Sequence, residues 1–239
     1  MAQYTFSRTE KKYAVPPALF PEVKAFVETF MIPEPKYHIY TLCNLYYDTD
    51  HFELARRSVE KPKFKEKLRL RSYGTPTLDS KVYLEAKSKY DGVVFKRRVG
   101  MPLFAVDAFL LEGKPPKDSQ IARELLYFHR LFDLKPKVYL AYDRIAYIGK
   151  ENPELRLTFD ENIRYRTEDL RLEAGDLGTP LLPDGTRIME IKSLGAVPKE
   201  ILAMLKHFSL TPMSFSKYGT IYKHLITMPK AETKETINA

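Results

Sequence analysis

The stretch that decides the fold covers residues 65–73 and reads Lys-Glu-Lys-Leu-Arg-Leu-Arg-Ser-Tyr. Successive side chains of a β-strand point to opposite faces, so the alternation of cations with leucines predicts a strand with one charged and one apolar face. The charged face carries Lys67, Arg69, Arg71 and Tyr73. The apolar reverse predicts a core on one side of the strand, and the cations need water or an anion on the other.

The same pattern recurs along the chain. Glu85 with Lys87, and Glu190 with Lys192, each share one face of a segment whose reverse is apolar. A single segment of this kind is most simply the solvated face of an antiparallel sheet. Across several segments, however, cations dominate and a carboxylate lies two residues from a lysine, which favours an anion site with a metal ion. The further positions with this pattern are Arg8, Glu10, Lys12, Arg144 and Arg156.

Strands alternate with fewer helices along the chain. Runs rich in β-branched and aromatic residues predict strands over 5–13, 40–48, 66–73, 81–88, 92–99, 137–147, 155–160, 163–169 and 186–194. Apolar residues at helical spacing predict helices over 17–31, 104–112, 119–132, 198–208 and 215–226, with Ser214 as the N-cap of the last one. Turn residues between neighbouring strands make a mostly antiparallel sheet the expectation.

Composition limits the class of protein. The 239 residues and 27.8 kDa fit one domain, which we place at 1–228, followed by a polar tail at 229–239 that we expect to be disordered. The net charge of +8 favours an anionic partner without identifying it. The single cysteine, Cys43, excludes an intrachain disulfide, and the histidines show no zinc-ligand spacing. Without a signal-like or membrane-spanning apolar stretch, we expect a cytoplasmic protein.

A series of short motifs in a fixed order carries a family resemblance. The chain resembles the VTC domain of the triphosphate tunnel metalloenzymes, also called the CYTH-like superfamily, and the resemblance covers nearly its whole length. Each motif is weak alone, and the eight in order are specific. They are Arg8-x-Glu10-x-Lys12-Tyr13, Tyr46-Tyr47-Asp48-Thr49, Lys65-x-Lys67-x-Arg69-x-Arg71-x-Tyr73, Leu84-Glu85-x-Lys87, Tyr142-x-Arg144-x-Ala146, Arg156-x-Thr158-x-Asp160, Met189-Glu190-Ile191-Lys192 and Ser214-Phe215-Ser216-Lys217-Tyr218.

The resemblance implies an α+β fold, in which an eight-stranded antiparallel β-barrel forms a tunnel and the helices pack outside it. It implies a polyphosphate polymerase that binds ATP and polyphosphate and passes the terminal phosphoryl group of ATP to the growing chain. Glu190 would hold a Mn²⁺ or Mg²⁺ ion, with Glu10 and Glu85 as further candidate ligands. The cations that would act in catalysis are Lys12, Arg69, Arg71, Lys87, Arg144, Arg156 and Lys192. Substrate would also contact Arg8, Lys67, Ser216 and Lys217.

Some positions depart from the family or fall outside its site. Ser214 stands where eukaryotic relatives tend to carry a lysine, which removes one expected cation from that end of the tunnel. Glu10 and Glu85 are also candidates for salt bridges that orient neighbouring cations. We expect Arg97, Arg98, Arg164 and Arg166 outside the tunnel. Eukaryotic relatives are fused to membrane spans and an SPX domain; this sequence shows neither, so any membrane partner remains unknown.

Two other functions use the same residues. A tunnel triphosphatase would hold an inorganic or nucleoside triphosphate with the same cations and use water as the acceptor. A noncatalytic RNA-binding barrel would stack bases on some of the 16 tyrosines and 14 phenylalanines. Glu190 argues against RNA, because a carboxylate among cations weakens a nucleic-acid surface but suits a metal-assisted phosphoryl transfer. We therefore expect no nucleic acid partner.

Overall fold

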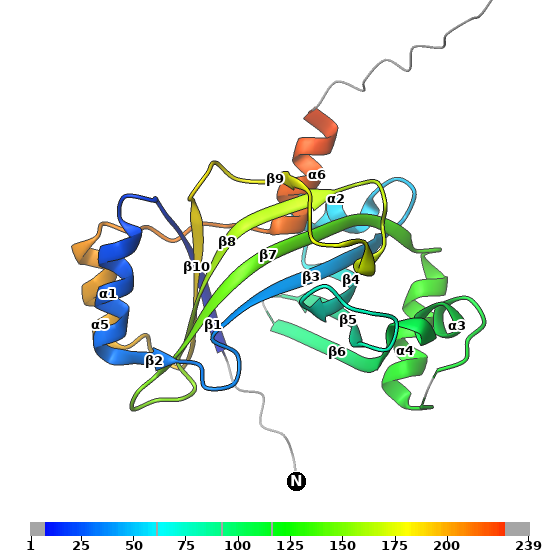
Figure 1. Ribbon diagram of the computed structural model, residues 1–239, viewed down its shortest axis with the longest axis horizontal. Coiled ribbons are helices and arrows are strands. Elements are labelled where there is room, and N and C mark those ends of the chain that lie inside the picture. The colour runs from blue at the N-terminus through cyan, green and yellow to red at the C-terminus, as the bar shows by residue number, and fades with distance from the viewer. Residues whose placement is uncertain (1–7, 61, 92, 116, 228–239) are drawn as a thin grey trace, which may run out of the picture.

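The computed structural model describes residues 8–60, 62–91, 93–115 and 117–227, apart from the side chain of Arg8. One curved antiparallel sheet runs through the molecule, with helices on both of its faces (Figure 1). The tail expected at 229–239 lies outside the described residues. The strands are β1 (Arg8–Val15), β2 (Met31–Pro33), β3 (Ile39–Asp48), β4 (Phe64–Tyr73), β5 (Lys81–Tyr90), β6 (Val93–Pro102), β7 (Lys135–Gly149), β8 (Arg156–Arg166), β9 (Thr179–Pro180) and β10 (Arg187–Leu194).

The sheet order is β1-β10-β8-β7-β3-β4-β5-β6, and β2 and β9 pair with β7 and β8 at its margin. Every pairing is antiparallel, as the turn residues predicted. The register confirms the alternation of charge: Arg69 lies opposite Glu85 and Lys12 opposite Glu190. These pairs all face the concave side of the sheet.

The sheet differs from the sequence-based expectation at β8. Segments 155–160 and 163–169 were expected as two strands, but Arg156–Arg166 is one strand. Asn162 sits inside it with φ 48°. The β7–β8 register also shifts, between Ala141 and Asp143. Such a bulge breaks the alternation without ending the strand, which explains why the pattern looked interrupted.

The expected closed barrel is wrong. Strands β1 and β6 are the two ends of the order, and no backbone pairing joins them in the part of the chain that the structure describes. The free edge of β1 is occupied instead by Met213, whose N–H donates to the carbonyl of Lys12 at 2.8 Å. Side chains also approach each other across the gap: the Glu10 carboxylate lies 3.9 Å from the Lys87 ammonium.

Two pairs of helices cover the convex face, as expected. Helices α1 and α5 pack on the β1–β10–β8 side, with Val23, Val27 and Ile201 in one core cluster. On the other side, the α4 residues Leu125 and Phe128 pack against the reverse of β4 and β5. The bounds are α1 (Phe20–Phe30), α3 (Val106–Leu110), α4 (Gln120–Leu131) and α5 (Lys199–His207).

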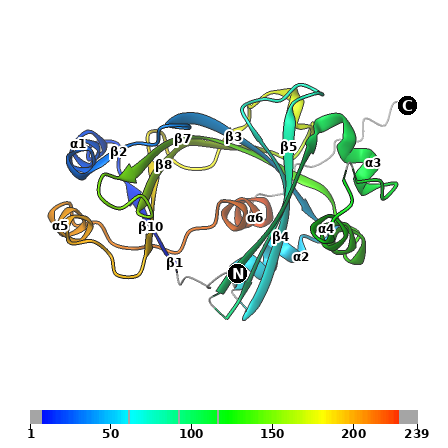
Figure 2. The ribbon, with the colours of Figure 1, turned by 90° about the horizontal axis from the view of Figure 1, so that it is seen from below.

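The other two helices correct the expectation that all helices lie outside. Helices α2 (Glu53–Glu60) and α6 (Lys217–Thr227) lie on the concave face, and Figure 2 shows α6 within the curve of the sheet. Ala55, Tyr218 and Ile221 join an inner apolar cluster there with Leu140 and Ile163. One part of the concave face is thus a third core, and the polar part beside it stays open for a site.

Candidate active site

A polar groove of about 780 Å³ lies on the concave face, between the sheet and the segment that leads into α6. Its volume is typical of small-molecule sites. Nearly all residues expected in the site line it. Those residues are Lys12, Arg69, Arg71, Lys87, Arg144, Lys192, Lys67, Ser216, Lys217, Glu190, Glu10 and Glu85.

Two expected residues are not among the described lining. Arg156 shares the concave face through its pairing with Lys192. It is, however, the exposed first residue of β8 and does not line the groove. The side chain of Arg8 lies outside the described residues, and only its backbone pairing with Leu194 is defined.

Glu190 is the carboxylate at the centre of the cations. Its side chain is 7% exposed, and four cationic nitrogens lie within 3.7 Å of it. Burial would raise the pKa of Glu190, but the surrounding cations outweigh burial and hold that pKa well below its usual range. The carboxylate is therefore ionised at neutral pH in the anion-free groove. The four cations are Lys217, Lys12, Lys192 and Arg144.

Asp160 forms a buried ion triad beneath the groove. The Arg144 guanidinium donates to both of its oxygens, at 2.6 and 2.8 Å, and the Lys217 ammonium donates to Oδ2 at 2.5 Å. Asp160 is fully buried, so the triad fixes the two cations in place. Asp160 belongs to the motif Arg156-x-Thr158-x-Asp160, but the sequence pattern assigns it no role. The available signal was its position two residues from Thr158 on the concave face of β8.

Glu85 is held by cations on all sides. The Arg69 guanidinium donates to Oε2 at 2.8 and 3.0 Å, while Lys96 and Arg98 lie 2.7 and 2.8 Å from Oε1. Burial opposes this ionisation, yet Arg69 and Arg71 bring the pKa of Glu85 down to about 2. In this arrangement the Glu85 carboxylate orients the Arg69 guanidinium. Arg98, expected outside, therefore contacts the site, because β6 pairs with β5 there.

Lys67 is a cation among cations. It lies directly opposite Lys87, and its ammonium donates to Ser216 Oγ at 2.8 Å. Burial, followed by the charges of Lys87 and Lys12, lowers the pKa of Lys67 to about 7. The same Ser216 Oγ accepts the N–H of Gly219, so Ser216 rather than Ser214 caps α6. An anion bound at this end of the groove would therefore stabilise the charged form of Lys67.

The affinity for tripolyphosphate is expected to depend on pH through Lys67. We expect tripolyphosphate to bind up to about tenfold more weakly for each pH unit above 7. Lys67 loses its proton in the anion-free groove above this pH, and it has to be protonated again when the anion binds. Titration calorimetry from pH 7 to 9 checks this. Lys67→Arg keeps the charge and should flatten the profile; a profile equally steep in that variant would assign the titration to other groups.

The described residues contain no cluster of three or more histidine, cysteine, aspartate or glutamate side chains suited to a metal. Two carboxylates nevertheless face the groove centre, Glu190 and Glu10, each with lysines around it. Mg²⁺ and Mn²⁺ sites in phosphoryl-transfer enzymes commonly use one or two carboxylates and complete their shell with phosphate oxygens and water. This donor set fits an ion that arrives with its substrate.

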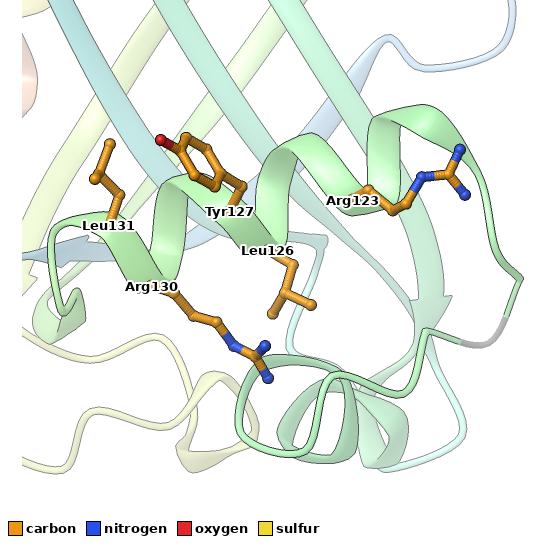
Figure 3. A pocket seen from close by; sticks show the side chains of 5 residues that line it. All are labelled: Arg123, Leu126, Tyr127, Arg130 and Leu131. Carbon is orange, nitrogen blue, oxygen red and sulfur yellow. The ribbon is translucent and has the colours of Figure 1, made fainter.

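A second hollow of about 430 Å³ lies on the outer side of α4. Figure 3 shows the side chains that line it, which all come from that helix. They offer two arginines and three apolar or aromatic residues but no carboxylate, so the hollow lacks the groups for phosphoryl transfer. The lining is Arg123, Leu126, Tyr127, Arg130 and Leu131.

In the described part of the chain, no helix is long and apolar enough to span a bilayer.

Solved structures resemble this chain at low sequence identity. No curated protein sequence matches the chain significantly. Among solved structures, a Bacillus halodurans protein provisionally described as an adenylate cyclase is 16% identical, with a TM-score of 0.52 over 87% of this chain and 92% of that one. A Vibrio parahaemolyticus protein of the same provisional description is 12% identical, with a TM-score of 0.48 over 95% of this chain and all of the other.

The first of these likenesses shows a shared fold. The family assignment comes from the sequence model of the VTC domain, which matches residues 7–226 and so covers nearly the whole chain. The family that the order of motifs predicted is thereby confirmed. The chain belongs to the VTC domain family.

Proposed function

We propose that this protein is a polyphosphate polymerase that transfers the terminal phosphoryl group of ATP to the end of a growing inorganic polyphosphate chain. The terminal oxygen of the chain would attack the γ-phosphorus of ATP, and the bond to the bridging oxygen would break to release ADP. Such a reaction needs no protein nucleophile. It needs a place for ATP, a place for a long polyanion, and charge that holds both in line.

The observation that carries the proposal is the length of the cationic face. On β4 the groove-facing positions from Lys65 to Arg71 are all cations, and these seven residues of strand extend over about 20 Å. On β5, Lys87 and Lys89 lie directly opposite Lys67 and Lys65. Like charges opposite each other destabilise a sheet, so this face is stabilised by a bound polyanion. A chain of phosphates longer than a triphosphate fits it.

The arginines of the groove would bind phosphate oxygens, and the lysines would neutralise their charge. Arg69, Arg71 and Arg144 have their guanidinium groups oriented by buried acceptors and would hold phosphate oxygens in fixed positions. Lys12 and Lys192 flank Glu190 at 3.2 and 3.4 Å and would act as point charges beside the transferring group. A Mn²⁺ or Mg²⁺ ion held by Glu190, and by Glu10, would supply further neutralisation of the phosphate oxygens.

The long cationic face and the buried carboxylate of Glu190 separate this proposal from the two alternatives. Hydrolysis of a triphosphate needs only the centre of the groove, so the lysines towards Lys65 would have no purpose in a triphosphatase. RNA binding would gain nothing from the buried carboxylate of Glu190 among the cations. Both remain outcomes of the decisive experiment.

That experiment incubates the purified protein with ATP and Mn²⁺ or Mg²⁺ and follows ADP, free phosphate and gel-resolved polyphosphate together. We expect ADP and long polyphosphate from the wild type, and a loss of about 100-fold or more in Glu190→Gln, which keeps the size of the side chain but removes its charge. The matched control is Glu112→Gln, an exposed change outside the lining of the groove that should leave the rate unchanged.

Two results would count against the polymerase, and a third would count against the role of Glu190. Free phosphate without polymer would favour a triphosphatase. Full activity in Glu190→Gln would remove this carboxylate from the chemistry. The absence of any turnover with either metal ion, together with tight binding of RNA, would favour the binding protein.

A further inference from the structure

Beyond Arg71 and Arg144, the concave face continues into a group of tyrosines. Tyr83 lies directly opposite Arg71 on β5, and Tyr40 lies directly opposite Arg144 on β3. Tyr73 follows Arg71 by two residues on β4 and so faces the same way, about 7 Å further along. We call the group the tyrosine cluster; it consists of Tyr37, Tyr40, Tyr73 and Tyr83.

The rings of the tyrosine cluster hold one another in place. Tyr37 and Tyr73 stack with centroids 5.5 Å apart at 28°, and Tyr83 meets Tyr73 edge-on at 6.0 Å. The Arg98 guanidinium lies 3.7 Å from the Tyr83 ring centroid and donates to the Tyr73 hydroxyl at 3.2 Å. The cluster is thus braced from the arginine side, which reduces the ordering that a ligand would have to impose.

The cluster is also open to solvent. Tyr37 is 46% exposed and Tyr73 is 41% exposed, whereas the tyrosines of the inner core, such as Tyr142 and Tyr218, are almost fully buried. Exposed aromatic surface directly beside phosphate-binding arginines is the combination that binds a nucleotide, because a base stacks on the ring while the cations hold its phosphates.

The two ends of the concave face therefore differ in chemistry. One end carries Lys65 and Lys89, and the other carries the tyrosine cluster. We infer that the tyrosine cluster binds the nucleobase of a nucleoside triphosphate, with the triphosphate directed along Arg71 and Arg144 towards Glu190. This inference rests on the proposed function for the presence of a nucleotide donor, and it fixes the direction of transfer: nucleoside at the tyrosine end, polymer at the lysine end.

The test compares two ligands that share a triphosphate and differ in the nucleoside. Dissociation constants for ATP and for inorganic tripolyphosphate are measured by calorimetry with EDTA present, so that no turnover occurs. We expect Tyr73→Leu to weaken ATP binding about tenfold and to leave tripolyphosphate binding nearly unchanged. Tyr73→Phe keeps the ring and should bind both ligands like the wild type.

Two further variants make the test selective. Tyr127→Leu alters an exposed tyrosine of α4, on the opposite face of the sheet, and should change neither dissociation constant (Figure 3). Tyr37→Leu alters the other exposed ring of the cluster and should reproduce the effect of Tyr73→Leu, which covers the case in which Tyr73→Leu does not fold.

Equal weakening of ATP and tripolyphosphate in the folded variants would overturn the inference, since the rings would then only support the arginines. Unchanged ATP binding in both leucine variants would overturn it as well. Failure of the polymerase is a separate result: ATP-selective binding without polymer formation would retain the nucleobase subsite, and polymer formation with no effect at Tyr73 or Tyr37 would retain only the polymerase.

Discussion

Asp160→Ala is expected to lower the free energy of unfolding by about 3–5 kcal/mol, because it removes the carboxylate that accepts hydrogen bonds from the buried cations Arg144 and Lys217. Asp160 is fully buried and receives three hydrogen bonds from these two residues. Urea unfolding followed by circular dichroism measures the change. Asp160→Asn keeps the shape and part of the hydrogen bonding, so it should lose less than the alanine variant.

The pH dependence of stability gives an independent check on Asp160. Burial would raise the pKa of this carboxyl, but Arg144 and Lys217 hold it below its usual range. Its contribution to stability is therefore present above the unfolded-state pKa and is lost as the pH falls through the lower folded-state pKa. The Asp160→Ala variant should show a weaker loss of stability on acidification. A wild-type stability and acid profile in Asp160→Ala would contradict the triad.

Asp48→Ala is expected to cost at least about 3 kcal/mol, since Asp48 joins three elements at one buried point. Its carboxylate accepts the N–H groups of Thr49, Leu54 and Ala55 at 2.8–2.9 Å and the hydroxyl of Tyr218 at 2.7 Å. Removing it leaves the first turn of α2 and the α6 tyrosine without an acceptor. The same urea titration measures the loss.

Tyr218→Phe is the matched control for Asp48. It removes only one of the four hydrogen bonds and keeps the ring that stacks on Tyr46 at 4.4 Å, so it should cost about 1 kcal/mol. In the double variant the tyrosine should add little once Asp48 is gone, because the two groups share one contact. Fully additive losses, or an Asp48→Ala variant as stable as the wild type, would show that Asp48 does not join α2 to α6.

Alternation along single strands was sufficient to place most of the groove. Lys67, Arg69 and Arg71 face the concave side because a strand has a period of two, and the apolar reverse of β4 allows no other orientation. The same reasoning correctly grouped Glu85 with Lys87 and Glu190 with Lys192. What the pattern could not supply was which strands are neighbours, and hence that Arg98 of β6 reaches Glu85.

Features that depend on distant parts of the chain escaped sequence analysis. Asp160 acquires its role from Arg144 and from Lys217, which lies 57 residues away in sequence. Helix α2 is short, and only Leu54, Ala55 and Ser58 are buried, so its apolar stripe is too narrow to stand out from a loop. The sheet is open between β1 and β6, and Met213 occupies the edge of β1, a contact that no local pattern in β1 indicates.

The open edge of the sheet has a topological consequence. A channel closed by backbone hydrogen bonds admits a polymer only by threading one of its ends, whereas here β1 and β5 meet through the Glu10–Lys87 ion pair at 3.9 Å, between side chains that are 33% and 47% exposed. An ion pair of that kind contributes at most about 1 kcal/mol and weakens with salt. A long polyphosphate could therefore enter sideways, in mid-chain, and a chain with no free end, such as a large cyclic phosphate, is not excluded from the groove by its topology.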